Sequence, residues 1–167
     1  IEEVVVTAER EDLMRISESI SKVSLNPVKI RQLPSIGDKD LFRTFQLLPG
    51  ISASNESSSG LYIRGGTPDQ NLILYDGFTV YHVDHLFGMF SAFIPNAISA
   101  VNLHKGTQPA NLGSRVSSVM EIKLKAPDTT KIKGRAGIGI LNSSLFLEGP
   151  VYNKRISFLL GARTTYS

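Results

Sequence analysis

Cysteine is absent from the 167 residues, which excludes disulfide bonds and thiolate metal sites. The chain also has little excess of charge of either sign. The 18 Lys and Arg give a net charge of only +3 and are scattered along the chain, so the dense basic surface of a nucleic-acid-binding domain is not indicated. With 167 residues, 41% of them hydrophobic, the chain can form one domain with a core and an appendage.

Long hydrophobic runs are lacking with one exception. Residues 86–103 carry no charge, but Pro95 and Asn96 interrupt them in the middle. A membrane-spanning helix needs about 20 mainly apolar residues. We therefore expect this segment to form loops and short helices of a soluble core rather than a membrane helix.

Catalytic motifs are lacking as well. The chain has no G-x-S-x-G, H-E-x-x-H, Walker loop or G-x-G-x-x-G. Its one metal-like cluster contains His82, Asp84 and His85; on a helix the two imidazoles would share a face, and a third ligand would have to come from elsewhere. The alternative is a loop with two hydrogen-bonded histidines. We expect no enzyme, no catalytic or metal-binding residue and no cofactor.

Apolar runs and turn residues predict a mixture of short strands and helices. Asp38 is a predicted N-cap for a helix that ends before Pro49. Asp76-Gly77 predicts a tight hairpin, and Pro95 predicts a short helix to about Ser99. The predicted strands are residues 22–25, 61–63, 72–75, 100–104 and 117–124.

Composition shifts after residues 126–128. We predict one long strand over residues 133–149, a turn over 150–154 and a return strand over 155–166. The first of these is too long for a small globular sheet, whose strands usually have about 5–6 residues. A tilted hairpin of a transmembrane β-barrel and a surface hairpin of an ordinary sandwich are both compatible with this pattern.

Five sequence motifs occur in an order that resembles that of a known protein family. The segments "EEVVVTA", "DLFRTFQLLPGIS", "YIRGGTPDQNLILYDG", "IPNAISAVNLHKGTQPANLGSR" and "SSVMEIKLK" follow one another over residues 2–125. Together they resemble the plug domain of TonB-dependent outer-membrane receptors, and "DQNLILYDGFTVY" with "HLFGMFS" resembles the Bacteroidetes-type branch.

The resemblance implies an α+β fold, in which a small mixed-sheet plug domain precedes a long antiparallel hairpin from a transmembrane β-barrel. It implies three parts: a TonB box and tether (residues 1–16), the plug (17–127) and the first barrel hairpin (128–167). The barrel of this family has about 22 strands, with the plug in its lumen.

The resemblance also implies two sites. A β-branched run would be captured by TonB as an added strand, and its residues are Glu3, Val4, Val5, Val6, Thr7 and Ala8. At the interface between plug and barrel, Arg64 would meet barrel carboxylates, Gly65 and Gly66 would let the backbone approach the wall, and Arg115 is a second candidate. The alternative for Arg64 is a surface arginine beside a glycine turn.

The function implied is the gate of an outer-membrane importer that takes up a nutrient ligand. Its expected partners are TonB with ExbB/ExbD as the energy source, the remaining barrel strands, a small nutrient ligand and a surface lipoprotein, but no nucleic acid. The expected location is the cell outer membrane, with the plug inside the barrel and the N-terminus in the periplasm. The rival hypothesis is a stand-alone plug-like protein that blocks another large barrel.

Overall fold

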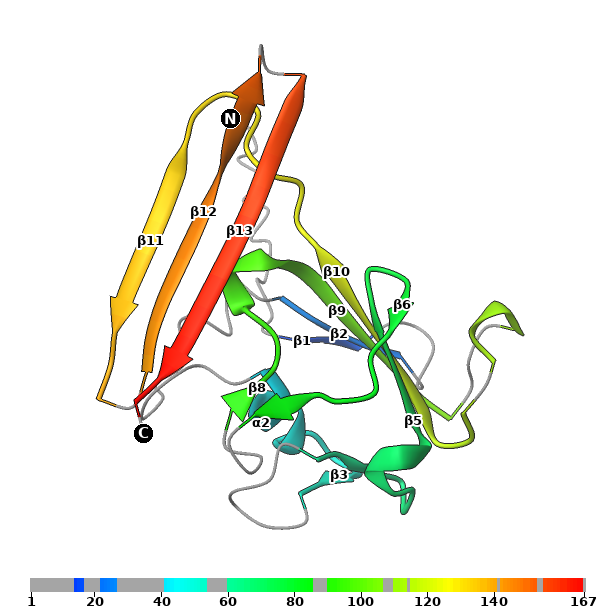
Figure 1. The fold of residues 1–167 in the computed structure, drawn as a ribbon. Coiled ribbons are helices and arrows are strands. Elements are labelled where there is room, and N and C mark those ends of the chain that lie inside the picture. Colours follow the sequence, from blue (N-terminus) through cyan, green and yellow to red (C-terminus); the bar gives the residue numbers. More distant parts are fainter. Residues whose placement is uncertain are drawn as a thin grey trace, which may run out of the picture.

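The computed structural model describes residues 14–16, 22–26, 41–53, 60–85, 90–106, 110–113, 115–140, 142–152 and 155–166. It contains two main sheets, which stand side by side in Figure 1. Within these described ranges, no helix is long and apolar enough to cross a membrane. Most of the described structure is strand, and helices are short.

The first sheet, here called the core sheet, has six strands in the order β1-β2-β9-β10-β5-β6. β10 lies inside the sheet, parallel to β5 on one side and antiparallel to β9 on the other. The other neighbouring pairs are antiparallel. The strand bounds are Met14–Ile16 (β1), Lys22–Leu25 (β2), Ile98–Lys105 (β9), Ser118–Leu124 (β10), Asn71–Tyr75 (β5) and Phe78–Thr79 (β6).

One face of the core sheet, its first face, is covered by α2 (Leu41–Gln46) and by the segment around Phe93. The ring of Phe93 stacks on Phe42 of α2 at a centroid distance of 5.7 Å and lies 5.2 Å from the ring of Tyr75. Because side chains alternate along a strand, Met120 and Ile122 of β10 point into this hydrophobic core. The neighbouring Glu121 and Lys123 therefore lie on the second face.

Several shorter elements surround the core sheet. β3 (Ile51–Ser52) pairs with β4 (Tyr62–Ile63), and β7 (Asp84–His85) pairs with β8 (Phe90–Ser91). Three short 3₁₀ helices complete the described structure, namely η1 (Pro68–Gln70), η2 (Pro95–Ala97) and η3 (Ala110–Leu112). η1 and η3 contain no buried residue, and η2 buries Ala97.

The local predictions are largely confirmed. The predicted hairpin turn joins β5 to β6, and Asp76 and Gly77 have φ of 51° and 90°, the positive values that a two-residue type I′ turn requires. The helix is confirmed over α2, while Asp38 lies outside the described residues. The turn that begins at Pro95 ends at Ala97 rather than Ser99, because Ile98 already pairs in β9.

The second sheet, here called the wall sheet, consists of three antiparallel strands in the order β11-β12-β13. Their bounds are Lys133–Ile138, Asn142–Tyr152 and Ile156–Thr165. The prediction of one strand over residues 133–149 is wrong, since the chain turns back after Ile138 and the amide of Gly139 donates to the carbonyl of Asn142 at 2.8 Å. The turn predicted over residues 150–154 is also placed too early, because β12 continues to Tyr152.

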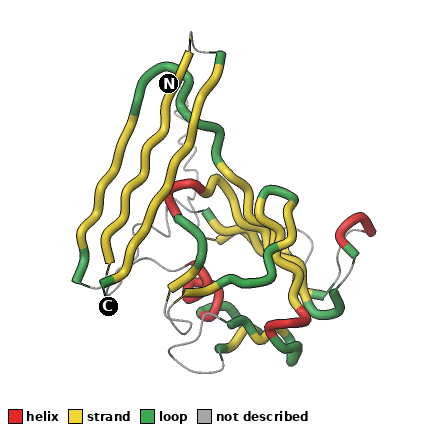
Figure 2. Tube along the Cα trace, viewed as in Figure 1, coloured by secondary structure: helices red, strands yellow, loops and turns green. Residues whose placement is uncertain are grey.

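The two sheets are joined by residues 125–132, which run from the end of β10 to the start of β11 (Figure 2). Asp128 holds this connection in shape: its Oδ1 accepts from the amide of Thr130 at 2.7 Å, and its Oδ2 lies 2.5 Å from Nζ of Lys133. A strand from the interior of the core sheet thus leads directly into the wall sheet.

Candidate functional site

The wall sheet has two chemically different faces. Cross-strand pairing places Leu147 between Gly134 and Leu160, and Leu145 between Ala136 and Ala162, so these side chains share an outer face. The alternate positions form an inner face, where Glu148 lies between Lys133 and Leu159. The other residues of the inner face are Arg135, Gly137, Ser144, Phe146, Gly161 and Arg163.

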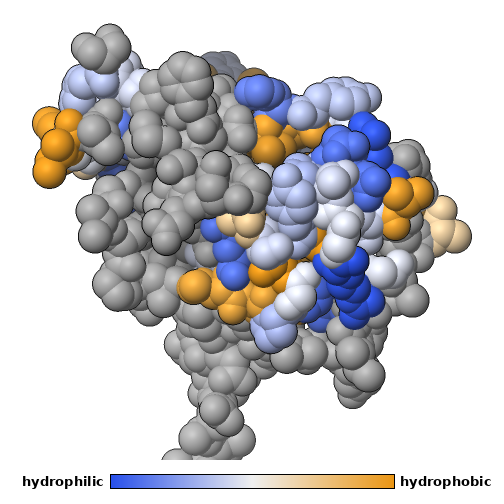
Figure 3. Space-filling view, turned by 90° about the horizontal axis from the view of Figure 1, so that it is seen from below, coloured by the Kyte–Doolittle hydropathy of each residue, from blue (hydrophilic) through white to orange (hydrophobic). Residues whose placement is uncertain are grey.

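The outer face exposes large apolar side chains, among them Leu145, Val151, Ile156 and Leu160. Ile138 and Ile140, at the turn between β11 and β12, are 88% and 96% exposed. Seen from below, hydrophobic surface stands at the far left, where this end of the wall sheet lies (Figure 3). A contiguous apolar face of this kind marks a surface that meets something other than water.

The inner face packs against the core sheet through a partly buried ion pair. Nζ of Lys125, just after β10, lies 2.7 Å from Oε1 of Glu148 on β12. The Glu148 side chain is only 9% exposed, and the same ammonium lies 4.7 Å above the ring centre of Phe146. Removing one partner of such a pair leaves the other charge poorly solvated, so the pair fixes how the two sheets sit together.

Arg163 of β13 makes a second contact between the sheets. Its guanidinium donates to the backbone carbonyl of Ser91 at 2.6 Å and to that of Phe93 at 3.1 Å. Both hydrogen bonds come from one terminal nitrogen, Nη2, which has two N–H groups to donate. Since Phe93 is part of the hydrophobic core, this contact ties the core directly to the wall sheet.

Beside the Arg163 contact, the backbone of Gly161 comes very close to the side chain of Ile94. A Cβ added to Gly161 would stand 2.4 Å from Cδ1 of Ile94, so only glycine fits there with Ile94 in place. The guanidinium of Arg135 donates to Oδ1 of Asn96 at 3.4 Å. Three inner-face positions on two strands therefore hold the segment from Ser91 to Asn96.

Arg64 occupies a strained turn. Arg64 and Gly65 have φ of 48° and 83°, and Ile63 and Gly66 exchange two backbone hydrogen bonds around them. This is a two-residue hairpin turn whose first position normally takes glycine, asparagine or aspartate. Arginine costs about 1 kcal/mol there. Strain of this kind at an exposed side chain is typical of a functional position.

The two glycines after Arg64 have separate roles. Gly65 supplies the positive φ, whereas Gly66 allows the turn to pack on Ser117, whose Oγ would lie 2.2 Å from an added Cβ. The close approach at Gly66 is thus made to the start of β10 in the core sheet. An NH1 atom of Arg64 lies against Gly106, and burial, with the Arg64 charge as a smaller contribution, lowers the pKa of Lys105.

Within the described residues, Arg64 has no carboxylate at ion-pair distance. Lys105, which sequence reasoning did not select, donates to the carbonyl of Pro49 at 3.2 Å. Two cations thus stand together at one end of the core sheet. This arrangement is suited to an anionic partner from outside the described chain.

Arg115 lines an open hollow of about 430 Å³ together with Asp69, Tyr81 and His82. A hydrogen bond from the Thr67 side chain is the main cause of the lowered pKa of Asp69, and the nearby Arg115 charge adds a little. No group of three or more His, Cys, Asp or Glu in the described part of the chain is placed to hold a metal ion. The predicted TonB-binding residues, Glu3 to Ala8, lie outside the described residues.

The main contacts between the sheets were missed by the sequence analysis. Lys125 and Glu148 are separated by 23 residues, and Arg163 and Ser91 by 72. The signal that was available is the placement of Glu148, Arg135 and Arg163 among apolar residues of the predicted barrel strands. Charges at alternate positions of such strands indicate a face turned away from lipid.

Comparison with solved structures gives several receptors with a similar fold. The siderophore receptor PirA from Pseudomonas aeruginosa is 22% identical, with a TM-score of 0.62 over 89% of this chain and 28% of its own. The alcaligin outer-membrane receptor FauA from Bordetella pertussis is 21% identical, with a TM-score of 0.58 over 93% of this chain and 27% of its own. The chain therefore spans little more than a quarter of the length of these receptors.

BauA, the ferric preacinetobactin receptor from Acinetobacter baumannii, is 18% identical, with a TM-score of 0.53 over 85% of this chain and 22% of its own. These matches support the fold class expected from the sequence, a mixed-sheet domain followed by the first antiparallel strands of a barrel, here three in number. The sequence pattern of the TonB-dependent Receptor Plug Domain matches residues 14–118, which is more than half of the chain. The chain belongs to the family of TonB-dependent receptor plug domains.

Proposed function

We propose that this chain forms the gate and the first wall strands of an outer-membrane importer that is driven through TonB. The observation that carries the proposal is the seating of the core sheet on the polar inner face of the wall sheet, whose outer face is apolar and exposed. The plug would close the lumen, a nutrient ligand would bind from outside the cell, and force on the N-terminus would rearrange the plug.

The order of strands in the core sheet supports such a response to force. β1 is an edge strand of three residues, paired only with β2, and it is the first described strand after the proposed TonB box. A short edge strand is held by few hydrogen bonds, so tension applied at residues 3–8 would detach it first. β10, by contrast, is paired on both sides.

Val5→Pro tests the coupling segment. Proline removes a backbone donor and fixes φ, so it disrupts pairing with an added strand. We expect binding of the purified periplasmic domain of TonB to the full chain to be lost, whereas the matched variant Val5→Thr keeps the donor and the β-branched shape and retains binding. Equal binding by both variants would contradict the assignment of residues 3–8.

The variant Arg64→Gly distinguishes the role of the Arg64 side chain from that of the turn. Glycine relieves the positive φ, and the guanidinium is lost. If Arg64 pairs with barrel carboxylates, the complete receptor carrying Arg64→Gly should conduct ions more readily in planar bilayers than wild type. A variant that is more stable than wild type and equally tight would identify Arg64 as a surface charge on a strained turn.

The rival hypothesis, a stand-alone plug-like protein, predicts a shorter reading frame than the importer does. A reading frame that continues past Ser167 into further alternating strands supports the importer. One that ends close to Ser167 supports the rival. Val5→Pro distinguishes them as well, because a simple blocking protein has no need of TonB.

A further inference from the structure

The strained turn at Arg64 lies against the end of one strand pair of the core sheet. Lys105 of β9 pairs with Ser118 of β10, and this is the last pair of their ladder on that side. Gly106 and Ser117 lie directly beyond it, one on each strand. Both of them contact the turn, and together they are here called the seat.

Ser117 holds the backbone of the turn. Its Oγ donates to the carbonyl of Ile63 at 3.0 Å, and its amide donates to the carbonyl of Gln70 at 3.2 Å. A Cβ at Gly66 would overlap the Ser117 side chain, so the turn lies directly on it. Because Ile63 and Gly66 are the residues that close the turn around Arg64, Ser117 fixes the turn at both of its ends.

Gly106 determines where the guanidinium of Arg64 can lie. A Cβ added to Gly106 would stand 2.6 Å from Nη1 of Arg64, and the φ of Gly106 is 104°. The guanidinium is the end of a long, flexible side chain, so a methyl group at Gly106 would push it aside. The guanidinium therefore keeps its place on the backbone just beyond β9 only if residue 106 has no side chain.

Lys105 connects β9 to the turn a second time. Its Nζ donates to the carbonyl of Pro49 at 3.2 Å. The carbonyl of the next residue, Gly50, accepts from the amide of Arg64 at 3.0 Å. All of the contacts that hold the turn lie among residues 49–118, ahead of the wall sheet in the chain. The position of the turn is therefore set by the core sheet and the segments packed on it.

A residue other than glycine persists at a positive φ only where its surroundings hold it there. From the contacts above we infer that Gly106 and Ser117 are positioning residues for Arg64, so that Arg64 meets its anionic partner only while β9 and β10 are paired at this end. The inference rests on the proposed function, in which that partner is a carboxylate of the barrel. Separation of β9 from β10 during opening would withdraw the seat and release Arg64 from the carboxylate.

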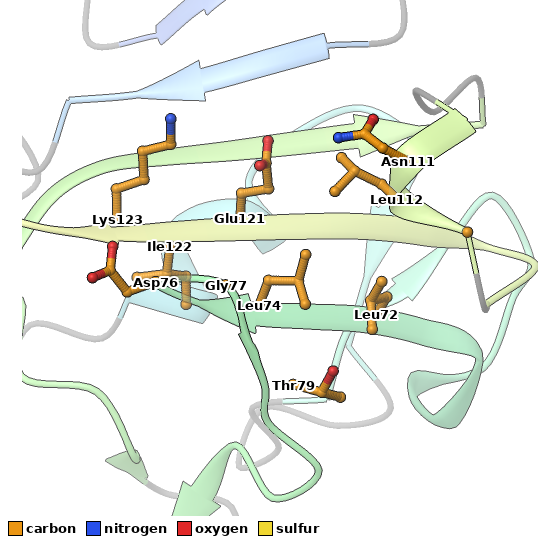
Figure 4. A pocket seen from close by; sticks show the side chains of 11 residues that line it. Leu72, Leu74, Asp76, Gly77, Thr79, Asn111, Leu112, Glu121, Ile122 and Lys123 are labelled. Carbon is orange, nitrogen blue, oxygen red and sulfur yellow. The ribbon is translucent and has the colours of Figure 1, made fainter.

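The opposite end of the same strand pair provides a matched control. There the Ser99 hydroxyl donates to the carbonyls of Lys123 and Leu124 at 3.1 Å and 2.9 Å. Figure 4 shows Lys123 at this end of β10 and Leu72 beside the other end, which is the end that meets the turn. Ser99→Ala therefore removes a comparable hydrogen-bond donor from the same two strands at a distance from Arg64.

Hydrogen exchange in the complete receptor in detergent micelles tests the seat itself. We expect Ser117→Ala to accelerate exchange of the Arg64 and Gly66 amides by about tenfold, which corresponds to about 1.4 kcal/mol in the free energy of opening the turn. Ser99→Ala should leave exchange in the turn unchanged. Unchanged exchange in Ser117→Ala would overturn the inference, and so would equal acceleration by Ser99→Ala, which would indicate a general loosening of the strand pair.

Ion conductance of the complete receptor in planar bilayers tests whether the seat acts through Arg64. Gly106→Ala and Arg64→Gly should each increase the leak, and the two changes combined should leak less than the sum of their separate effects. The strain that alanine adds at the positive φ of Gly106 is the same with or without Arg64, so this comparison cancels it.

Two results of the conductance measurement would overturn the inference and leave the proposed function intact. They are an additive leak in the double variant, and a tight Gly106→Ala receptor beside a leaky Arg64→Gly receptor. A tight Arg64→Gly receptor would instead contradict the proposed contact of Arg64 with the barrel, and the inference would fall with it.

Discussion

In both the core sheet and the wall sheet, side chains alternate between the two faces, but the kind of residue on the covered face differs. In β10, Met120 and Ile122 turn toward a hydrophobic core, and polar Glu121 and Lys123 turn away from it. In β12, the inner face buries the charged Glu148 beside Phe146, and Leu145 on the outer face is exposed. The period of two is common to both sheets, but the covered face is apolar at these positions of β10 and includes a charged side chain in β12. The environment of each face, rather than the pattern itself, decides which residues are covered.

The largest expected effect tests the difference between the two faces of the wall sheet at two adjacent positions of β13. Leu160 lies on the outer face and Leu159 on the inner face. In a lipid bilayer, Leu160→Lys should cost about 2–4 kcal/mol, because lysine near the middle of a lipid-facing strand is poorly solvated. Leu159→Lys should cost much less.

The measurement is the free energy of unfolding of the complete receptor in lipid vesicles, from urea titration of both variants. In water, without lipid, Leu160→Lys should instead reduce self-association of the 167-residue chain. Equal costs for the two lysines would show that the outer face does not meet lipid.

A smaller effect is expected at the contact between the sheets. Glu148→Ala leaves the Lys125 ammonium without its partner near Phe146, and a loss of about 2–3 kcal/mol is expected. The double variant Lys125→Met with Glu148→Leu removes both charges and should recover most of the loss. Hydrogen exchange of β12 amides and urea unfolding measure the change, and a harmless Glu148→Ala would show that the sheets are held elsewhere.

The smallest effect concerns pH and the connection between the sheets. Hydrogen bonds from Lys133 and from Thr130 hold the pKa of the Asp128 carboxyl well below its usual value of 3.8. Since the folded pKa is the lower one, the contribution to stability is present above about pH 4 and is lost as pH falls through the folded pKa. Between pH 5 and pH 2 the melting temperature of wild type should therefore fall more steeply than that of Asp128→Asn. Parallel curves would contradict a role for this carboxylate.

Features fixed by neighbouring residues were the predictable ones. Asp76-Gly77 specifies its turn through two residues that tolerate positive φ. Because proline cannot continue a helix, Pro49 predicts a helix end before it, and α2 ends at Gln46. The break between β11 and β12 was missed because residues 139–141 contain no proline or aspartate, and the small residues before them read as continuous strand. At the site, Arg64, Gly65 and Gly66 were selected by family resemblance. Arg163 and Glu148 required knowledge of contacts over long sequence separations, which no local pattern supplies.

The place of β10 within the core sheet has a consequence for synthesis. Without β10, the remaining strands form two separate pieces, β1-β2-β9 and the β5-β6 hairpin. A chain made from its N-terminus cannot join these pieces until residues 118–124 have emerged, and pairing of Leu72 with Val119 closes a long stretch of chain. The first wall strand follows after only residues 125–132. Completion of the plug and the start of the wall are thus nearly simultaneous events, so the two parts are expected to be assembled as one unit rather than as a finished plug threaded into a finished barrel.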